Sequence, residues 1–231
     1  MPRRARIHLD HVPLHIVQRG HNRNVCFFTA DDYRTYLHWM HEALTDAQCT
    51  LHAYVLMTNH VHLLLTPRNA AAVPGVLISL GRRYVQRINR IHGRTGTLWD
   101  SRYKSSLIHA NSYFMSCQRY IELNPVRAAI VRDPADYPWS SYRVHGLGQP
   151  DSLVSPHALY YSLGRDGPER QAAYRKLVEA QLDRAVTDRI RSALSQGAPV
   201  GDSLFLQMVE QVTGVPSTPR PRGRPWPRGK P

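Results

Sequence analysis

The sequence predicts an α+β fold, in which an antiparallel sheet carries helices. Four segments rich in β-forming residues are bounded by turn residues, and three others repeat their apolar residues every three or four positions. After residue 145 the strand signal fades and short helical patterns follow. We therefore expect one α+β domain over residues 1–145 and a helical C-terminal extension over residues 146–213.

The first half of the domain has the pattern of a strand, a helix and a hairpin. Residues 13–19 form the first strand candidate, and two aspartates suited to a helix N-terminus open a helical pattern over residues 31–47. Residues 50–57 and 61–66 are the next two strand candidates, separated by a short polar turn.

The second half adds a helix over residues 76–92, a strand over residues 98–108 and a helix over residues 112–131. Pro125 should end or kink that last helix near Asn124, because proline lacks a backbone N–H. The resulting β-α-β-β-α-β order, followed by a helix, is ferredoxin-like, with an antiparallel sheet and helices packed on one side.

The C-terminal residues 214–231 are rich in proline, arginine and glycine and should be a disordered basic tail. The motif Pro221-Arg222-Gly223-Arg224-Pro225 resembles an AT-hook. Narrow A·T-rich minor grooves attract arginine, so Arg222 and Arg224 are candidates for contact with A·T-rich duplex DNA. The alternative is a solvated tail with only non-specific attraction.

The composition favours a polyanionic partner. Lysine and arginine number 30 against 17 aspartates and glutamates, a formal net charge of +13. A charge that serves only solubility is the alternative. No apolar run approaches the ~20 residues of a spanning helix, and the N-terminus lacks the apolar stretch of a signal peptide. Three widely spaced cysteines form neither a zinc motif nor a disulfide framework, so we expect a reduced, cytoplasmic protein.

A candidate metal site lies in the segment His60-Val61-His62. Alternate residues of a strand share one face, so the two imidazoles stand about 7 Å apart along it and can converge on one divalent cation. Without nearby cysteines, and with a distant third ligand, Mg²⁺ or Mn²⁺ is favoured over structural zinc. A lone His-x-His pair is more often packed or on the surface.

A candidate nucleophile lies sixty residues later. Tyr120 and Asn124 are four apart and therefore share a helix face, whereas Glu122 should face away from both. Most helix-face tyrosines only pack. Beside a cation that neutralises a phosphate, however, a phenol is a useful nucleophile, because it is far easier to deprotonate than a serine hydroxyl.

Together these motifs resemble a known family. His60-Val61-His62 followed by Tyr120-Ile121-Glu122-Leu123-Asn124-Pro125-Val126-Arg127-Ala128 is similar to the single-tyrosine HUH transposases, in particular the branch of REP-associated tyrosine transposases (RAYTs), domesticated relatives of bacterial insertion-sequence transposases. The resemblance covers about residues 8–145 and includes the segments 20–23, 98–104 and 139–142.

The resemblance implies a site and a substrate. His60, His62 and Asn124 would bind Mg²⁺ or Mn²⁺, and Tyr120 would attack DNA to leave a 5′-phosphotyrosine. The substrate implied is single-stranded DNA with hairpins formed by repetitive extragenic palindromes, which places the protein at the bacterial nucleoid. Insertion-sequence relatives work as dimers and RAYTs are associated with monomers, so the sequence leaves both states open.

Further residues could bind DNA by tracking phosphates or stacking on unpaired bases. Arg102 and Lys104 are the best candidates, because strand alternation puts them on one face. For the helical arginines the alternative is a solvated helix face. The full set of candidates is Arg82, Arg83, Arg87, Arg90, Trp99, Arg102, Tyr103 and Lys104.

These observations predict a metal-dependent single-stranded DNA endonuclease and strand transferase that cleaves and rejoins hairpin-forming palindromic DNA through Tyr120. One alternative is a catalytically silent, palindrome-binding DNA regulator on the same fold. Another is a hydrolytic metalloenzyme acting on a small phosphoester, which would need neither the tyrosine nor the charge. Formation of a covalent protein–DNA adduct separates the first prediction from the silent regulator. The small-phosphoester enzyme would instead turn over a small substrate, and Tyr120→Phe would leave that activity unaffected.

Overall fold

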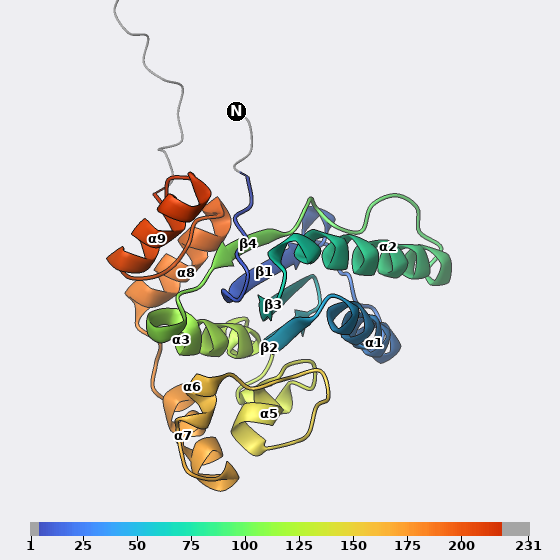
Figure 1. The fold of residues 1–231 in the computed structure, drawn as a ribbon. Coiled ribbons are helices and arrows are strands. Elements are labelled where there is room, and N and C mark those ends of the chain that lie inside the picture. The colour runs from blue at the N-terminus through green and yellow to red at the C-terminus, as the bar shows by residue number, and fades with distance from the viewer. Residues whose placement is uncertain (1–4, 219–231) are drawn as a thin grey trace, which may run out of the picture.

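The computed structural model describes residues 5–218 and contains a four-stranded antiparallel sheet in the order β2-β3-β1-β4 (Figure 1). This is the ferredoxin-like strand order, and the predicted fold class is confirmed. The residues 219–231, with Arg222 and Arg224, lie outside the described part of the chain. The strands are β1 (Leu14–Arg19), β2 (Cys49–Met57), β3 (His60–Pro67) and β4 (Lys104–Leu107).

Helices α1 (Ala30–Asp46) and α2 (Val73–Ile91) cover one face of the sheet (Figure 1). The first begins at a capping box, in which Thr29 and Asp32 each accept a hydrogen bond from the other's backbone N–H. Tyr36 of α1 and Tyr84 of α2 pack edge to face against each other, with ring centroids 5.0 Å apart. This apolar face is the larger part of the core.

Helices also cover the opposite face, which corrects the expectation that they pack on one side only. The helix α3 (Ala110–Glu122) packs there, and after Leu123 a short turn of helix, α4 (Asn124–Arg127), continues it. The cause is the composition of β2, whose residues are almost all buried, so that it offers apolar side chains to both faces. The space between the sheet and α3 is where a site can form.

The expected strand over residues 98–108 is shorter than predicted, because the chain bends at Ser101 and Arg102. Trp99 forms one isolated bridge with Gly20, and the Asp100 N–H donates to the Arg19 carbonyl at 2.8 Å. Regular pairing with β1 resumes only at Lys104.

The C-terminal extension forms two groups of helices (Figure 1). The first packs near α3 and the second beside β4, and the expected boundary at residue 145 falls within α5. No helix of residues 5–218 is long and apolar enough to cross a membrane. The helices are α5 (Tyr142–Leu147), α6 (Ala158–Tyr161), α7 (Gly167–Glu179), α8 (Arg184–Gln196) and α9 (Ser203–Thr213), and short 3-10 turns occur at His21–Arg23, Ala70–Ala72 and Pro134–Asp136.

Candidate functional site

The register of the sheet brings basic and metal-ligating side chains together on the face toward α3. Val17 of β1 pairs with His62 of β3 on one side and with Lys104 of β4 on the other. Arg19 pairs with His60. Because alternate residues share a face, these side chains form one row across three strands.

His60 and His62 lie side by side, with ring centroids 5.1 Å apart. Burial is the main cause that lowers the pKa of His60 to about 4, and the positive charge of nearby Arg19 lowers it further. A hydrogen bond to the Asn124 side chain acts in the opposite direction and raises this pKa. Burial also lowers the pKa of His62, and neighbouring His15 adds to that effect. Both imidazoles are therefore neutral at pH 7, the form in which histidine binds a metal.

His15 is a part of the site that the sequence did not reveal. Its Nε2 lies 2.8 Å from Nδ1 of His62, and both rings are buried. When His62 carries its proton on Nδ1, that N–H donates to His15 and leaves Nε2 of His62 free for a ligand. Such outer partners fix the orientation of ligating histidines. Its spacing with Val17 and Arg19 shows that His15 shares a strand face with them. The pairing of β1 with β3 is needed to show that this face carries His62.

Tyr120 and Asn124 face the histidines from α3 and α4. The Tyr120 ring centroid is 6.0 Å from that of His62 and 5.8 Å from that of His15. Within the described residues, Nδ2 of Asn124 is buried without a hydrogen-bond partner. The structure thus brings the predicted nucleophile and its three predicted ligands together in one chain, and Glu122 faces away as expected.

The donor set fits a hard divalent cation. Residues 5–218 contain no cluster of three or more His, Cys, Asp or Glu side chains that could hold a metal, so the histidine pair needs a third donor of another kind. Asn124 supplies an amide oxygen beside His60. Two imidazole nitrogens and one amide oxygen, with positions open to solvent, suit Mg²⁺ or Mn²⁺.

These residues line a cavity of about 450 Å³ whose charged side chains are mostly cations. Arg127 lies over the Tyr120 ring, with its guanidinium carbon 4.0 Å from the ring centroid. Among the described residues, Arg19, Arg102, Lys104 and Arg127 form no ion pair. The lining residues are Val17, Arg19, His60, His62, Asp100, Ser101, Arg102, Lys104, Tyr120, Asn124, Arg127, Ala128, Arg191, Leu194 and Ser195.

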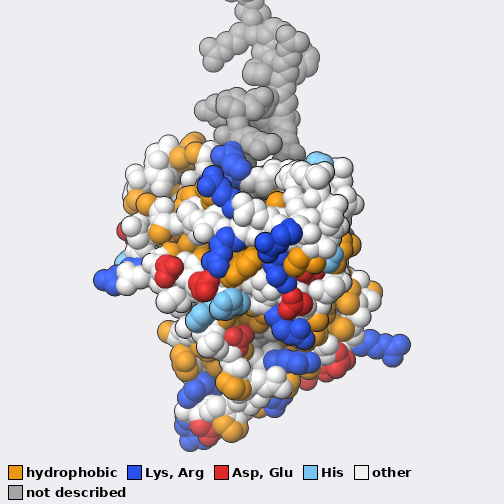
Figure 2. All heavy atoms as spheres, turned by 90° about the vertical axis from the view of Figure 1, so that its right-hand side faces the viewer, with side chains coloured by type: hydrophobic (Ala, Val, Ile, Leu, Met, Phe, Trp, Pro, Cys, Tyr) orange, Lys and Arg blue, Asp and Glu red, His pale blue; other side chains and the backbone are white. Residues whose placement is uncertain are grey.

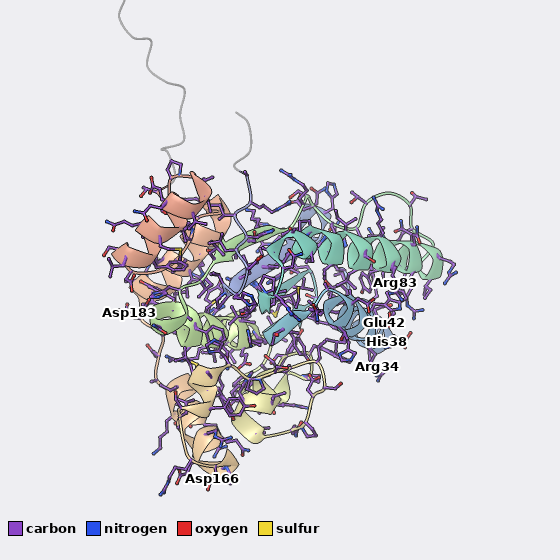
Figure 3. All side chains as sticks on the ribbon, viewed as in Figure 1. Arg34, His38, Glu42, Arg83, Asp166 and Asp183 are labelled. Atoms are coloured by element: carbon purple, nitrogen blue, oxygen red, sulfur yellow. The ribbon has the colours of Figure 1, made fainter. Side chains whose placement is uncertain are left out.

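The predicted DNA-binding residues divide between this cavity and the rest of the molecule. Arg102 and Lys104 line it, although the bend places Arg102 outside the strand. The arginines of α2 lie on the other side of the sheet and do not line it. Arg83 points toward Glu42 of α1, 2.8 Å away (Figure 3).

The face at the ends of α1 and α2 mixes basic with acidic side chains (Figure 2). Arg87 pairs with Asp31 there, whereas Arg82 and Arg90 are exposed. This is the solvated helix face that the sequence offered as the alternative for these arginines.

Two aromatic candidates are corrected, because both are buried. Trp99 is 7 % exposed and packs against Tyr84, with ring centroids 6.0 Å apart. Tyr103 is 6 % exposed, stacked on His8 and covered by the Arg6 guanidinium. Neither ring offers a free face to a DNA base, because large aromatic rings gain most from being buried against other side chains.

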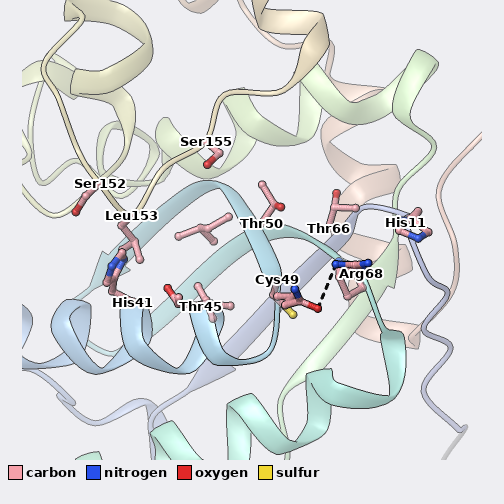
Figure 4. Close-up of a pocket in the computed structure, with 14 residues that line it drawn as sticks. His11, His41, Thr45, Cys49, Thr50, Thr66, Arg68, Ser152, Leu153 and Ser155 are labelled. Atoms are coloured by element: carbon pink, nitrogen blue, oxygen red, sulfur yellow. Dashed lines mark hydrogen bonds between the residues drawn. The ribbon is translucent and has the colours of Figure 1, made fainter.

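A second cavity, of about 540 Å³, lies between the end of α1, the edge of β2 and the segment around Ser152 and Ser155 (Figure 4). Its lining contains one guanidinium, that of Arg68, which donates to the Gln48 side chain at 3.5 Å. The described residues that line it include no tyrosine and no row of cations, so it is a weaker candidate site than the cavity at Tyr120.

Comparison with known proteins identifies the family of this chain. The family model described as IS200-like transposases matches residues 8–124, just over half of the chain, and includes every predicted ligand and Tyr120. The chain belongs to the IS200-like transposase family. Membership in this family makes it a transposase-like protein that acts on DNA.

Two solved structures are similar to this family member. A REP-associated tyrosine transposase bound to a REP hairpin is 18% identical, covering 68% of this chain and 93% of its own, with a TM-score of 0.53. At that identity the likeness confirms the RAYT fold. A transposase-like protein from Deinococcus radiodurans R1 is 22% identical over 52% of this chain and 96% of its own, with a TM-score of 0.34. No curated protein matches.

Proposed function

We propose that the chain is a metal-dependent single-stranded DNA endonuclease and strand transferase of the RAYT kind. The observation that carries the proposal is the convergence of Tyr120, His60, His62 and Asn124 on one cation-lined cavity. A nucleophile, neutral nitrogen and oxygen ligands, and cations that mostly form no ion pair among the described residues together suit a phosphodiester. A small phosphoester would need fewer cations and no tyrosine.

In the proposed reaction, the phenol oxygen of Tyr120 forms a bond to a DNA phosphorus while the bond from that phosphorus to the 3′-oxygen breaks. The phenol loses its proton, the 3′-oxygen gains one, and the 5′ end stays attached as phosphotyrosine. This ester keeps the energy of the phosphodiester. A second DNA hydroxyl can therefore attack it and rejoin strands without ATP.

Each neighbour of Tyr120 has a role in this proposal. His60, His62 and Asn124 would hold Mg²⁺ or Mn²⁺, which when bound would neutralise and polarise the phosphate. His15 keeps His62 oriented through their hydrogen bond. Arg127 and Lys104 attract the DNA backbone.

The proposed substrate is hairpin-forming palindromic single-stranded DNA. Support comes from the shared fold and from the hairpin bound to the solved REP-associated transposase. On this proposal the protein works at the bacterial nucleoid, and Arg222 and Arg224 could add contacts to A·T-rich duplex beside the hairpin. A site complete within one chain is compatible with a monomer.

The test is covalent capture on a denaturing gel, using labelled single-stranded hairpin DNA from palindromes beside the protein's own gene with Mg²⁺ or Mn²⁺. We expect a shifted band that needs metal and is lost in Tyr120→Phe. The matched control is Tyr113→Phe, a half-buried tyrosine two turns earlier on α3, which should leave the band intact. Tight, metal-independent binding with no adduct would favour the silent regulator instead.

A further inference from the structure

The C-terminal extension is joined to the sheet beside the Tyr120 cavity. The segment after α8 adds to the edge of β4, where the Val200 N–H donates to the Leu107 carbonyl at 2.8 Å. The Ser106 hydroxyl donates to the Ala198 carbonyl at 2.5 Å. Ile190 and Leu194, on the inner face of α8, are buried. These contacts hold α8 in a fixed place relative to the catalytic face.

That docking places Arg191 in the wall of the cavity, with Leu194 and Ser195 beside it. Its guanidinium carbon lies 6.0 Å from the Tyr120 ring centroid, and that of Arg127 lies 4.0 Å from the same centroid. Two cations from different elements therefore converge on one tyrosine. The nearest carboxylate to Arg191, that of Asp188, is 3.7 Å away on its own helix, a weak surface pair.

Two like charges held near each other are unfavourable unless an anion lies between them. The two guanidiniums are close enough that Arg191, after burial, contributes to lowering the pKa of Arg127. The neighbouring Tyr120 side chain raises the pKa of Arg127, but Arg127 has no carboxylate partner within the described residues. A phosphate would offset the repulsion, because guanidinium groups bind phosphate oxygens through charge-assisted hydrogen bonds.

We propose that Arg191 and Arg127 together bind a backbone phosphate of the DNA next to Tyr120, so that the C-terminal extension forms part of the DNA-cleavage site. This inference rests on the proposed function and deepens it. The family match ends at Asn124, and both arginines lie beyond it. Arg191 thus makes the extension a substrate-binding element of this chain.

The test compares Arg191→Gln with Arg184→Gln. Both arginines are on α8 and both pair loosely with Asp188, but Arg184 is 96 % exposed and does not line the cavity. Glutamine keeps the helix propensity of arginine and removes the charge. The readouts are the dissociation constant for single-stranded hairpin DNA across a series of salt concentrations, and the single-turnover rate of adduct formation.

We expect Arg191→Gln to weaken binding about tenfold or more at low salt and to reduce the slope of log K against log salt by about 0.7. The rate of adduct formation should fall as well. Arg191→Lys should restore the salt slope and not the full rate, since lysine cannot bind bidentately. Arg184→Gln should match the parent in both readouts.

Equal effects of the Arg191 and Arg184 substitutions on the salt slope would overturn the inference and leave Arg191 as a surface residue. If the parent protein forms no adduct at all, the proposed function fails. The salt slope then still decides whether Arg191 contacts DNA, so the two failures are distinguishable.

Discussion

The two faces of helix α3 differ in whether their charged groups have partners within the protein. On one, the Glu122 carboxylate is fully buried and accepts hydrogen bonds from Ser141, His145 and Tyr174. On the other, Tyr120 lies among cations of which most form no ion pair with the residues that the structure describes. A charge satisfied within the protein holds the fold together, whereas one left unsatisfied is available to a ligand.

The two faces depend on each other, because the Glu122 network fixes the helix that carries the tyrosine. Ser141 and His145 come from α5 and the turn before it, and Tyr174 comes from α7. Two elements, α5 with the turn before it and α7, therefore hold α3 in place through one carboxylate. We call the side of α3 that carries Glu122 the packed face. Because the packed face supplies the stability, most of the cations on the opposite face can remain without an ion pair among the described residues.

The largest expected effect comes from breaking the packed face. Glu122→Ala removes the acceptor of three buried donors and should lower the free energy of unfolding by about 3–5 kcal/mol. Urea denaturation measures it. The matched control is Glu179→Ala, an exposed carboxylate on α7, which should stay within about 0.5 kcal/mol of the parent. A small loss for Glu122→Ala would contradict the structural role of the network.

The next effect tests the support of the metal site. His15→Leu removes the hydrogen bond that orients His62, and should weaken Mn²⁺ binding by about 10–100-fold. Titration calorimetry of the folded variant measures it. His52→Leu, a buried histidine on β2 outside the cavity, is the control and should leave Mn²⁺ affinity unchanged. Equal affinities for the parent and His15→Leu would remove His15 from the site.

The packed face should also be acid-sensitive through His52, which contacts Phe114 of α3. Burial lowers the pKa of His52 to about 4. Between about pH 6.5 and 4, His52 is therefore protonated in the unfolded chain and neutral in the folded chain. Stability is therefore lost as pH falls from 6.5 toward 4, by about 2 kcal/mol between pH 7 and 5 for this one group. Urea denaturation at both pH values should show a smaller loss in His52→Leu, and an identical loss would contradict the assignment.

The smallest effect concerns α2, away from both faces of α3. Arg82→Gln and Arg90→Gln change exposed arginines that do not line the cavity, so hairpin affinity should change by no more than about twofold. A gel-shift titration beside Lys104→Gln measures the contrast. A larger loss from α2 than from Lys104 would move the DNA path to the other side of the sheet.

The sequence predicted the parts of the site that depend on local periodicity. Strand alternation placed His60 and His62 on one face, and helical spacing placed Tyr120 with Asn124. Those rules need only the neighbours along the chain. The element order likewise predicted the fold class, because few topologies suit that order.

The remaining parts depend on tertiary placement that periodicity does not contain. His15 acquires its partner only from the register of β1 against β3, and Arg191 reaches the cavity only because α8 docks on β4. Trp99 and Tyr103 failed as base-stacking candidates because composition does not say which aromatic rings the core buries. A basic, aromatic segment can look the same in sequence whether its rings face solvent or the interior.

The most direct test of the central claim identifies the residue that carries the DNA. The parent protein is incubated with Mn²⁺ and single-stranded hairpin DNA, treated with nuclease and digested with trypsin. Cleavage after Arg119 and Arg127 releases the peptide from Tyr120 to Arg127, which contains one tyrosine. Mass spectrometry should find this peptide with a nucleotide on Tyr120, only when metal is present. Cleaved DNA with a free 5′-phosphate, or a nucleotide on any other residue, would contradict the account.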